Sequence, residues 1–278
     1  MKSVEVVPPE PLNRESLRSI AIQTLEPYHK KVLFFFESLG ERYAKVYLYN
    51  MDFTDDKLST DPYLAMEFFI RHSFYRGRRQ ELSSRYVNDV LRVLDEYELK
   101  NAPIESLLED KFLSRIKEIK ISKKDIEHLE SLFSELRKLK NEGYNFYNYI
   151  RNLVKAGELE KVYKELKGIK EVGDKIASFI LRDVILISQI RKNIDRKEVP
   201  YIFPVDTHVR KVIKDYLALS SEEKLFDYIE GLQKNDTLSV SRIAAGMWYS
   251  YYHSFELLLE NFLLSESHPN LSLSFSST

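Results

Sequence analysis

Residues 166–211, LKGIKEVGDKIASFILRDVILISQIRKNIDRKEVPYIFPVDTHVRK, are the most informative stretch of the chain. Gly168 and Gly173 bracket a tight connection between one helix that ends near Lys164 and another that starts near Asp174. Glycine lets the backbone turn sharply and approach a phosphate closely, and the free N–H groups of the second helix can donate to phosphate oxygens. The stretch therefore predicts a helix–hairpin–helix, which holds a DNA backbone without reading its sequence.

A helical pattern extends outward from this stretch. Apolar residues recur at intervals of three and four through most of the chain, and the alternation typical of strands is scarce. Asp61 followed by Pro62 predicts a helix start, with an aspartate cap and proline at the first helical position. Ser122 with Asp125 predicts another start that resembles a capping box, and that helix should stop near Gly143. The expected fold class is all-α.

Later helices are predicted over 145–155, 157–166, 174–190, 206–218, 221–232 and 238–263. Residues 191–203 break the pattern with charges and a proline, so we expect a loop there. Residues 44–50, AKVYLYN, fit a strand or a helix equally well.

We expect these helices to form two lobes with a cleft between them, where a ligand would bind. The organisation predicted along the chain is an N-terminal helical segment that packs with the C-terminal lobe, 1–60, a central lobe with the hairpin, 61–200, and a C-terminal lobe with a frayed tail, 201–278.

Composition excludes several classes of site. The chain has 278 residues, 44% of them hydrophobic, which is ample for a buried core. It has no cysteine, which excludes disulfides, thiolate zinc sites, a cysteine nucleophile and a cysteine-ligated iron–sulfur cluster. No apolar signal core and no stretch near the roughly 18 apolar residues of a membrane span are present. We therefore expect a cytoplasmic protein without a membrane partner.

Charge is unevenly distributed along the chain. The net charge of −1 argues against nucleic-acid binding when taken alone, because such proteins often carry a basic excess. Residues 76–85, RGRRQELSSR, however, hold four arginines against one glutamate, and residues 111–124 hold six basic residues against Glu118. Each basic run fits either a nucleic-acid contact or a solvated helix face.

A specific resemblance lies within the first stretch. VGDKIASFIL, residues 172–181, followed by FPVDTHVRKV, residues 203–212, resembles the catalytic segment of the helix–hairpin–helix (HhH-GPD) DNA glycosylase superfamily. Lys175 matches the lysine that marks members combining base removal with strand cleavage, and Asp206 matches the catalytic aspartate. Their separation of 31 residues, 206 − 175, is similar to that in the archaeal 8-oxoguanine DNA glycosylase family.

The sequence departs from that family at two places. Glu171 stands where the hairpin usually has a glycine, which places a carboxylate near the expected phosphate. Trp248, the single tryptophan, does not align with the aromatic residues that hold the flipped base in the archaeal family.

A second resemblance covers PYLAMEFFIRHSFYRGRRQELSSRYV, residues 62–87, which is similar to the superfamily's early helix, whose following loop enters the DNA. Phe74 and Tyr75 would then fill the hole left by the flipped base, or both could belong to the core. Phosphates on either side would be held by three arginines, Arg76, Arg78 and Arg79. Three aromatic residues, Phe146, Tyr147 and Tyr149, could stack on the base or face the core.

The implied chemistry suits these residue types. An amine can attack the sugar C1′ and remain bonded as an imine, whereas a hydroxyl cannot. Free lysine has a pKa of about 10.4, so we expect desolvation and the positive end of the hairpin helix to favour the neutral amine. Asp206 would stabilise the cationic sugar, although a surface lysine and a helix-capping aspartate are the simpler interpretations. His208 could orient the site, touch a phosphate or be structural.

The resemblance thus implies a bifunctional DNA N-glycosylase and AP lyase that excises an oxidised base, most simply 8-oxoguanine, without a metal or other cofactor. Its expected partner is damaged double-stranded DNA, and we expect a monomer. Two alternatives are an oxidised-pyrimidine glycosylase and a non-catalytic helix–hairpin–helix DNA-binding protein.

Overall fold

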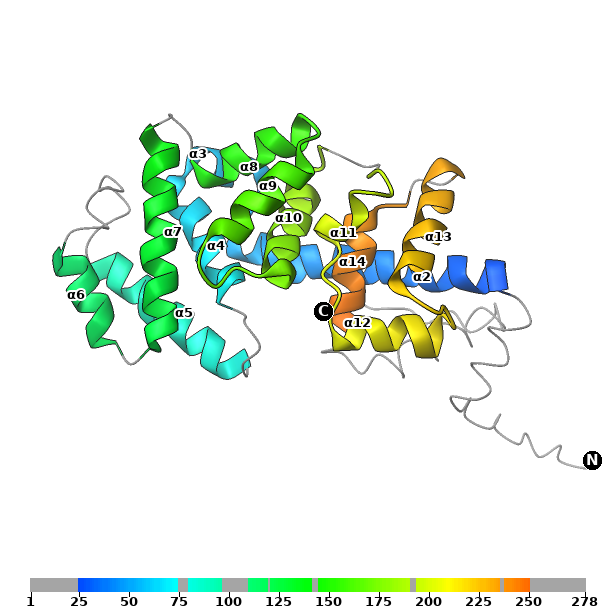
Figure 1. The fold of residues 1–278 in the computed structure, drawn as a ribbon, viewed down its shortest axis with the longest axis horizontal. Helices are drawn as coiled ribbons and strands as arrows, with labels where there is room; N and C mark the ends of the chain where they lie inside the picture. The colour runs from blue at the N-terminus through cyan, green and yellow to red at the C-terminus, as the bar shows by residue number, and fades with distance from the viewer. Residues whose placement is uncertain are drawn as a thin grey trace, which may run out of the picture.

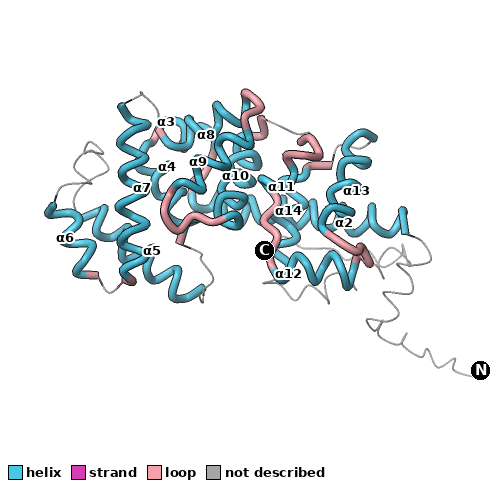
Figure 2. The backbone as a smooth tube through the Cα atoms, viewed as in Figure 1, coloured by secondary structure: helices cyan, strands magenta, loops and turns pink. Residues whose placement is uncertain are grey.

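The computed structural model describes residues 25–74, 80–96, 110–119, 121–141, 145–190, 194–235 and 238–250. Every regular element within these ranges is helical, and no strand occurs among them (Figure 2). The expected all-α fold class is confirmed. Within the same ranges, no helix combines the length and the apolar character needed to cross a bilayer.

The first half of the chain forms α2 (Leu25–Tyr43), η1 (Ala44–Leu48), η2 (Tyr49–Met51), α3 (Asp55–Thr60), α4 (Pro62–Ser73), α5 (Gln80–Glu96), α6 (Asp110–Glu118) and α7 (Lys123–Asn141). The second half forms α8 (Phe146–Lys155), α9 (Leu159–Gly168), α10 (Asp174–Ser188), α11 (Val199–Ile202), α12 (Thr207–Lys211), η4 (Val212–Tyr216), α13 (Glu222–Asn235) and α14 (Val240–Tyr249).

Capping residues set the helix starts that the sequence predicted. The Asp61 carboxylate accepts hydrogen bonds from the backbone N–H groups of Tyr63 and Leu64, at 2.9 and 3.0 Å, and Pro62 opens α4. The Ser122 hydroxyl likewise accepts from the Asp125 N–H at 3.2 Å, at the start of α7.

The structure decides two segments that interrupt the predicted pattern of helices. Residues 44–50, which fitted a strand or a helix equally well, are helical in η1 and η2. The expected loop at 191–203 contains the short helix α11, with Pro200 near its start, so the loop prediction is wrong for those four residues. The predicted frayed tail lies outside the described residues.

The helices gather on two sides of α10 (Figure 1). Helices α3 to α9 lie on one side and α11 to α14 lie on the other, and α2 runs behind α14. Helix α2 packs closely along α14, because Gly40 and Gly246 have no Cβ at the crossing. A Cβ at Gly246 would collide with the Phe36 carbonyl, and one at Gly40 would collide with the Arg242 carbonyl.

A buried polar cluster joins α10 to α2 and α4. The Asp183 carboxylate, which is completely buried, accepts hydrogen bonds from the Tyr43 hydroxyl at 2.6 Å, from His72 Nε2 at 2.8 Å and from Arg182 Nε at 2.7 Å. Burial alone would raise the pKa of Asp183, but the Arg182 guanidinium and the hydrogen bond from His72 outweigh it and lower the pKa from 3.8 to about 2. Asp183 is therefore a buried carboxylate that stays ionised.

Replacing Asp183 with alanine should lower the free energy of unfolding by about 3–5 kcal/mol, because Arg182 would remain buried without its counter-charge. Urea denaturation at neutral pH measures this loss. In the control Asp227→Ala, the carboxylate that pairs with Arg196 is exposed, so its removal should cost at most about 1 kcal/mol.

Wild type and Asp183→Ala also differ in how their unfolding free energies depend on pH, and the direction of this dependence follows from the pKa of Asp183. Because folding lowers the pKa of Asp183, its stabilisation is present above pH 3.8 and is lost as the pH falls toward about 2. The difference in unfolding free energy between wild type and Asp183→Ala should narrow across that interval, and a constant difference would contradict the ionised state.

Candidate active site

A five-residue turn, 169–173, connects α9 to α10. Ile169 and Val172 are buried and anchor the turn in the core, and the Val172 N–H donates to the Ile169 carbonyl at 3.0 Å. Gly173 precedes α10 in an extended conformation, and no side chain caps the helix there. The backbone N–H groups at the start of α10 are thus not covered by a capping side chain.

The left-handed position of this turn is Glu171, whose φ is 67°. Gly168 and Gly173, at which the sequence predicts the sharp turn, do not have a positive φ. A Cβ at either glycine would meet no heavy atom within 4 Å, so neither is required by local packing. The resemblance to the superfamily leads us to expect a glycine at position 171. The backbone there is left-handed, a conformation that glycine adopts without steric cost and that Glu171 adopts under strain.

Lys175 and Asp206 lie in direct contact. The Lys175 Nζ donates a hydrogen bond to Asp206 Oδ2 at 3.0 Å, although 31 residues separate them in the chain. The other oxygen, Asp206 Oδ1, accepts from the Val209 N–H at 3.0 Å and caps α12. Asp206 is therefore both a helix cap and an ion-pair partner. Its interpretation as a capping residue and its interpretation as the acidic partner of Lys175 are compatible.

The segment before Asp206 is held against α10. Helix α11 contacts α10, and the Ser178 hydroxyl donates to the Pro200 carbonyl at 3.4 Å. Phe203 is buried and packs on Phe226 of α13, with ring centres 5.4 Å apart. These contacts place Asp206 opposite the first turn of α10.

The amine of Lys175 is accessible to a ligand. Its side chain is 43% exposed, and that of Asp206 is 22% exposed. The desolvation expected for a lysine nucleophile is thus not supplied by the protein alone. A hollow of about 310 Å³ lies beside Lys175 and is lined partly by apolar side chains, among them Phe203, Pro204 and Phe226.

A pair of aromatic residues that the sequence did not reveal, buried Phe179 and partly exposed Trp248, lies close to the same amine. The Lys175 Nζ lies 5.7 Å from the ring centre of Phe179, one helical turn further along α10. Phe179 meets Trp248 of α14 edge to face, with ring centres 4.9 Å apart, and Arg182 lies 4.3 Å from the Phe179 ring centre. The spacing of Lys175 and Phe179 along a helix could have revealed Phe179, whereas only the tertiary fold places Trp248.

Phe74 does not fit the predicted role of a wedge in DNA. It is completely buried, and its ring meets His128 edge to face with centres 5.6 Å apart. The alternative interpretation, a core residue, is the right one for Phe74, because this residue, the first after α4, packs its ring against His128 of α7. The other predicted contacts of this region, Tyr75, Arg76, Arg78 and Arg79, lie outside the described residues.

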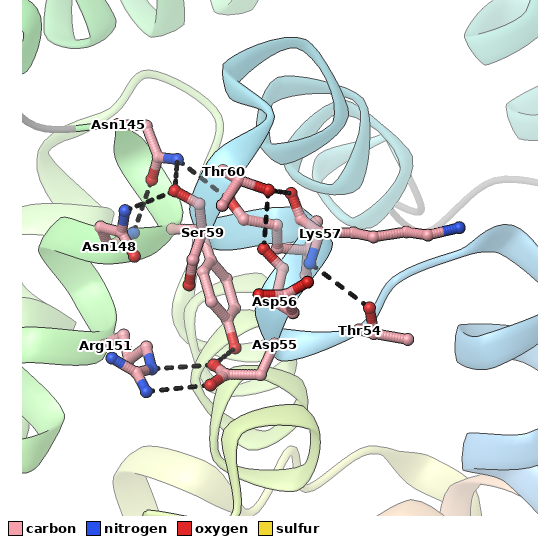
Figure 3. A network of polar contacts seen from close by, with 11 residues as sticks. Thr54, Asp55, Asp56, Lys57, Ser59, Thr60, Asn145, Asn148 and Arg151 are labelled. Carbon is pink, nitrogen blue, oxygen red and sulfur yellow. Dashed lines mark hydrogen bonds and ion pairs between the residues drawn. The ribbon is translucent and has the colours of Figure 1, made fainter.

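Two aromatic residues of α8, Phe146 and Tyr147, also belong to the protein interior, whereas Tyr149 is partly exposed. Phe146 packs on Phe69, and the Tyr147 hydroxyl donates to Asp55 at 2.6 Å. Arg151 pairs with the same aspartate, which ties α8 to the start of α3 (Figure 3). Tyr149 donates to Glu165 at 2.8 Å. None of these three aromatic residues lines the Lys175 hollow.

His208 contacts a hydroxyl of the neighbouring helix end. Its Nε2 lies 3.1 Å from the Ser250 Oγ, and Ser250 in turn donates to the Met247 carbonyl at 2.7 Å. This contact links the start of α12 to the end of α14, as expected for a structural histidine close to the site.

No family model matches the chain, and no solved structure matches it. An uncharacterized protein of Methanocaldococcus jannaschii is 34% identical over 90 residues, which is 32% of this chain and 21% of that protein. The chain thus matches about a fifth of the length of that relative.

The conformation of the turn is testable by replacing Glu171 with glycine. The left-handed conformation costs an L-residue about 1–2 kcal/mol, and the greater freedom of glycine in the unfolded chain offsets about 0.5–1 kcal/mol. We therefore expect a small net gain in the free energy of unfolding, measured by urea denaturation.

The comparison is Glu160→Gly, in the first turn of α9, which should lose about 1 kcal/mol because glycine is a poor helix former and the ion pair with Lys164 is lost as well. Equal losses of unfolding free energy in Glu160→Gly and Glu171→Gly would show that the backbone at residue 171 does not adopt the left-handed conformation.

Proposed function

We propose that the protein is a bifunctional DNA N-glycosylase and AP lyase that removes an oxidised base from duplex DNA. Lys175 is the nucleophile and Asp206 is its acidic partner. The observation that carries the proposal is the 3.0 Å contact between Lys175 Nζ and Asp206 Oδ2 at the start of a helix that follows a tight turn. The match of both residues to the HhH-GPD superfamily supports it.

The contact suits the chemistry of base removal. The nucleophile must be a neutral amine, and Asp206 Oδ2 lies where it can accept the proton that the Lys175 ammonium loses. The amine then forms a bond to the sugar C1′ as the bond from C1′ to the base breaks, and the base leaves with the bonding electrons. Asp206 passes the proton that it accepted to the departing base, so it is again a carboxylate as it stabilises the positive charge that develops on the sugar.

Strand cleavage follows from the same covalent bond. Opening of the sugar ring converts the C1′ amine into an imine of Lys175. Loss of a proton from C2′ then expels the 3′ phosphate by β-elimination, and hydrolysis of the imine releases the lysine. Asp206 is placed to move protons in these later steps, because one of its oxygens faces the amine while the other is held by the Val209 N–H.

We propose that bound DNA completes the desolvation of the site. Lys175 is half exposed in the free protein, so a flipped nucleotide that covers the amine would remove it from water. Trp248, which is partly exposed beside Phe179, is the contact that we propose for the base, because aromatic rings stack on bases. The turn at 169–173 would hold the backbone as a helix–hairpin–helix, with DNA in the cleft between the two lobes.

The proposed lesion is 8-oxoguanine, by resemblance to the archaeal family. Excision from duplexes that carry either 8-oxoguanine or thymine glycol separates this lesion from the oxidised-pyrimidine alternative. Preferential excision of thymine glycol would be consistent with the proposed chemistry but would make an oxidised pyrimidine the substrate.

Trapping with borohydride tests the nucleophile. Borohydride reduces an imine, so wild-type protein should become covalently linked to a duplex that contains 8-oxoguanine, and Lys175→Gln should give no adduct. The matched control is Lys167→Gln, which removes a lysine of nearly equal exposure, 41%, from the other side of the turn and should still give the adduct.

A companion variant separates the two roles of Asp206. Asp206→Asn keeps an oxygen for the Val209 N–H, so stability should change by less than about 1 kcal/mol, whereas loss of the charge should slow base excision by about 10²-fold or more.

Two results would contradict the proposal. An adduct formed by Lys175→Gln would exclude Lys175 as the nucleophile. Binding of duplex DNA by wild type, without excision or trapping on any oxidised base, would favour the non-catalytic DNA-binding alternative.

A further inference from the structure

The guanidinium of Arg182, on α10, is completely buried, but one of its three nitrogen atoms has no hydrogen-bond acceptor. Nε donates to Asp183 Oδ1 at 2.7 Å, and Nη2 donates to the Tyr43 hydroxyl oxygen at 3.2 Å. The third nitrogen, Nη1, is buried without such a partner. A buried donor that is left unpaired costs free energy, so a group outside the described part of the chain is needed to accept from Nη1.

The acceptors of the Asp183 cluster are directed at other donors. Burial raises the pKa of Tyr43 well above its ordinary value, so the hydroxyl keeps its hydrogen and donates it to Asp183 Oδ2 at 2.6 Å. The same Oδ2 accepts from His72 Nε2, and Oδ1 accepts from Arg182 Nε. An acceptor for Nη1 therefore has to come from outside this cluster.

Three aromatic rings border the guanidinium. Its central carbon lies 4.3 Å from the ring centre of Phe179, 5.0 Å from that of Tyr43 and 5.7 Å from that of Trp248. The rings attract the cation, but they offer no oxygen to its N–H groups. Phe179 and Tyr43 are buried, whereas Trp248 is partly exposed. Of these three rings, Trp248 is thus the one past which a ligand can reach Arg182.

The unpaired donor lies close to the candidate nucleophile. The Lys175 Nζ and the Arg182 guanidinium carbon lie 5.7 and 4.3 Å from the centre of the same Phe179 ring. A single nucleotide covers this span, with its C1′ at Lys175 and its base extending toward Trp248. The polar edge of the base then lies where an acceptor for Nη1 is needed.

We infer that Arg182 is a specificity-determining residue whose Nη1 donates a hydrogen bond to a carbonyl oxygen of the flipped base. This inference rests on the proposed function, in which Lys175 attacks C1′ of that nucleotide. 8-Oxoguanine offers two such oxygens, O6 and O8. A base that lacks the recognised oxygen leaves a buried donor unpaired, which is the arrangement that discriminates most strongly between similar ligands. Because Nη1 is covered in the free protein, Trp248 has to move as the base enters.

The affinities of wild type for three duplexes test the inference without any variant. Each duplex carries one 2′-fluoroarabino nucleotide, which resists excision, with 8-oxoguanine, with 2-amino-8-oxopurine, which lacks O6, or with guanine, which lacks O8. We expect wild type to bind the 8-oxoguanine duplex about tenfold or more tightly than the duplex without the recognised oxygen. The fluorescence of Trp248, the single tryptophan, should change on binding of 8-oxoguanine.

Arg182→Lys tests the residue itself. The lysine ammonium keeps a positive charge beside Asp183, whereas Nη1 is lost. Affinity for the 8-oxoguanine duplex should fall by about tenfold, the effect of one hydrogen bond from a charged donor. Affinity for the duplex without the recognised oxygen should fall by less than about threefold.

The matched control is Tyr43→Phe, which removes hydrogen bonds from the same cluster but leaves Nη1 in place. It should change the affinities for all three duplexes by one common factor. Circular dichroism first shows that both variants are folded at the temperature of the binding measurements.

The outcomes distinguish the inference from the proposed function. Equal affinity of wild type for the three duplexes overturns the role of Arg182, and so does an equal loss for all three in Arg182→Lys. A change in discrimination in Tyr43→Phe as large as in Arg182→Lys also overturns it, because the effect would then follow from disruption of the cluster. In each of these cases, a borohydride adduct of wild type leaves the glycosylase standing. Failure of wild type to excise or to form the adduct overturns the proposed function, and the inference with it.

Discussion

The ionised carboxylate of Asp183, buried in the middle of the molecule, is the constraint on which the rest of the structure depends. A charge in an apolar interior is stable only when donors surround it, and three helices supply them here: Tyr43 from α2, His72 from α4 and Arg182 from α10 itself. The positions of these helices are therefore coupled. Helix α10 cannot shift by a turn without leaving the carboxylate partly unsatisfied.

The start of the same helix carries the candidate chemistry. Lys175, Phe179 and Arg182 follow one another at helical spacing, and Arg182 and Lys175 both lie against the Phe179 ring. The Asp183 cluster thus places the amine opposite Asp206, whose own position comes from its role as the cap of α12. Lys175 and Asp206, which are 31 residues apart in the chain, therefore meet at a distance of 3.0 Å.

The sequence allowed local features to be predicted, since they depend on neighbouring residues. The caps at Asp61 and Asp206 and the tight turn before Asp174 are of this kind. The contact of Lys175 with Asp206 was anticipated only through resemblance, since spacing along the chain does not determine distance in space. Features that depend on tertiary packing could not be predicted from the sequence. They are the burial of Phe74, the proximity of Trp248 to Phe179, and the hydrogen bond between Tyr43 and Asp183, which are 140 residues apart.

The central claim is that the Lys175 amine forms a covalent bond with the sugar of a damaged nucleotide. The most direct measurement is tandem mass spectrometry of the adduct that borohydride stabilises on DNA, after digestion of the protein and the nucleic acid. The account predicts that the sugar remnant resides on Lys175, in the peptide that contains the first turn of α10. A remnant on another lysine or on the N-terminal amine would contradict it.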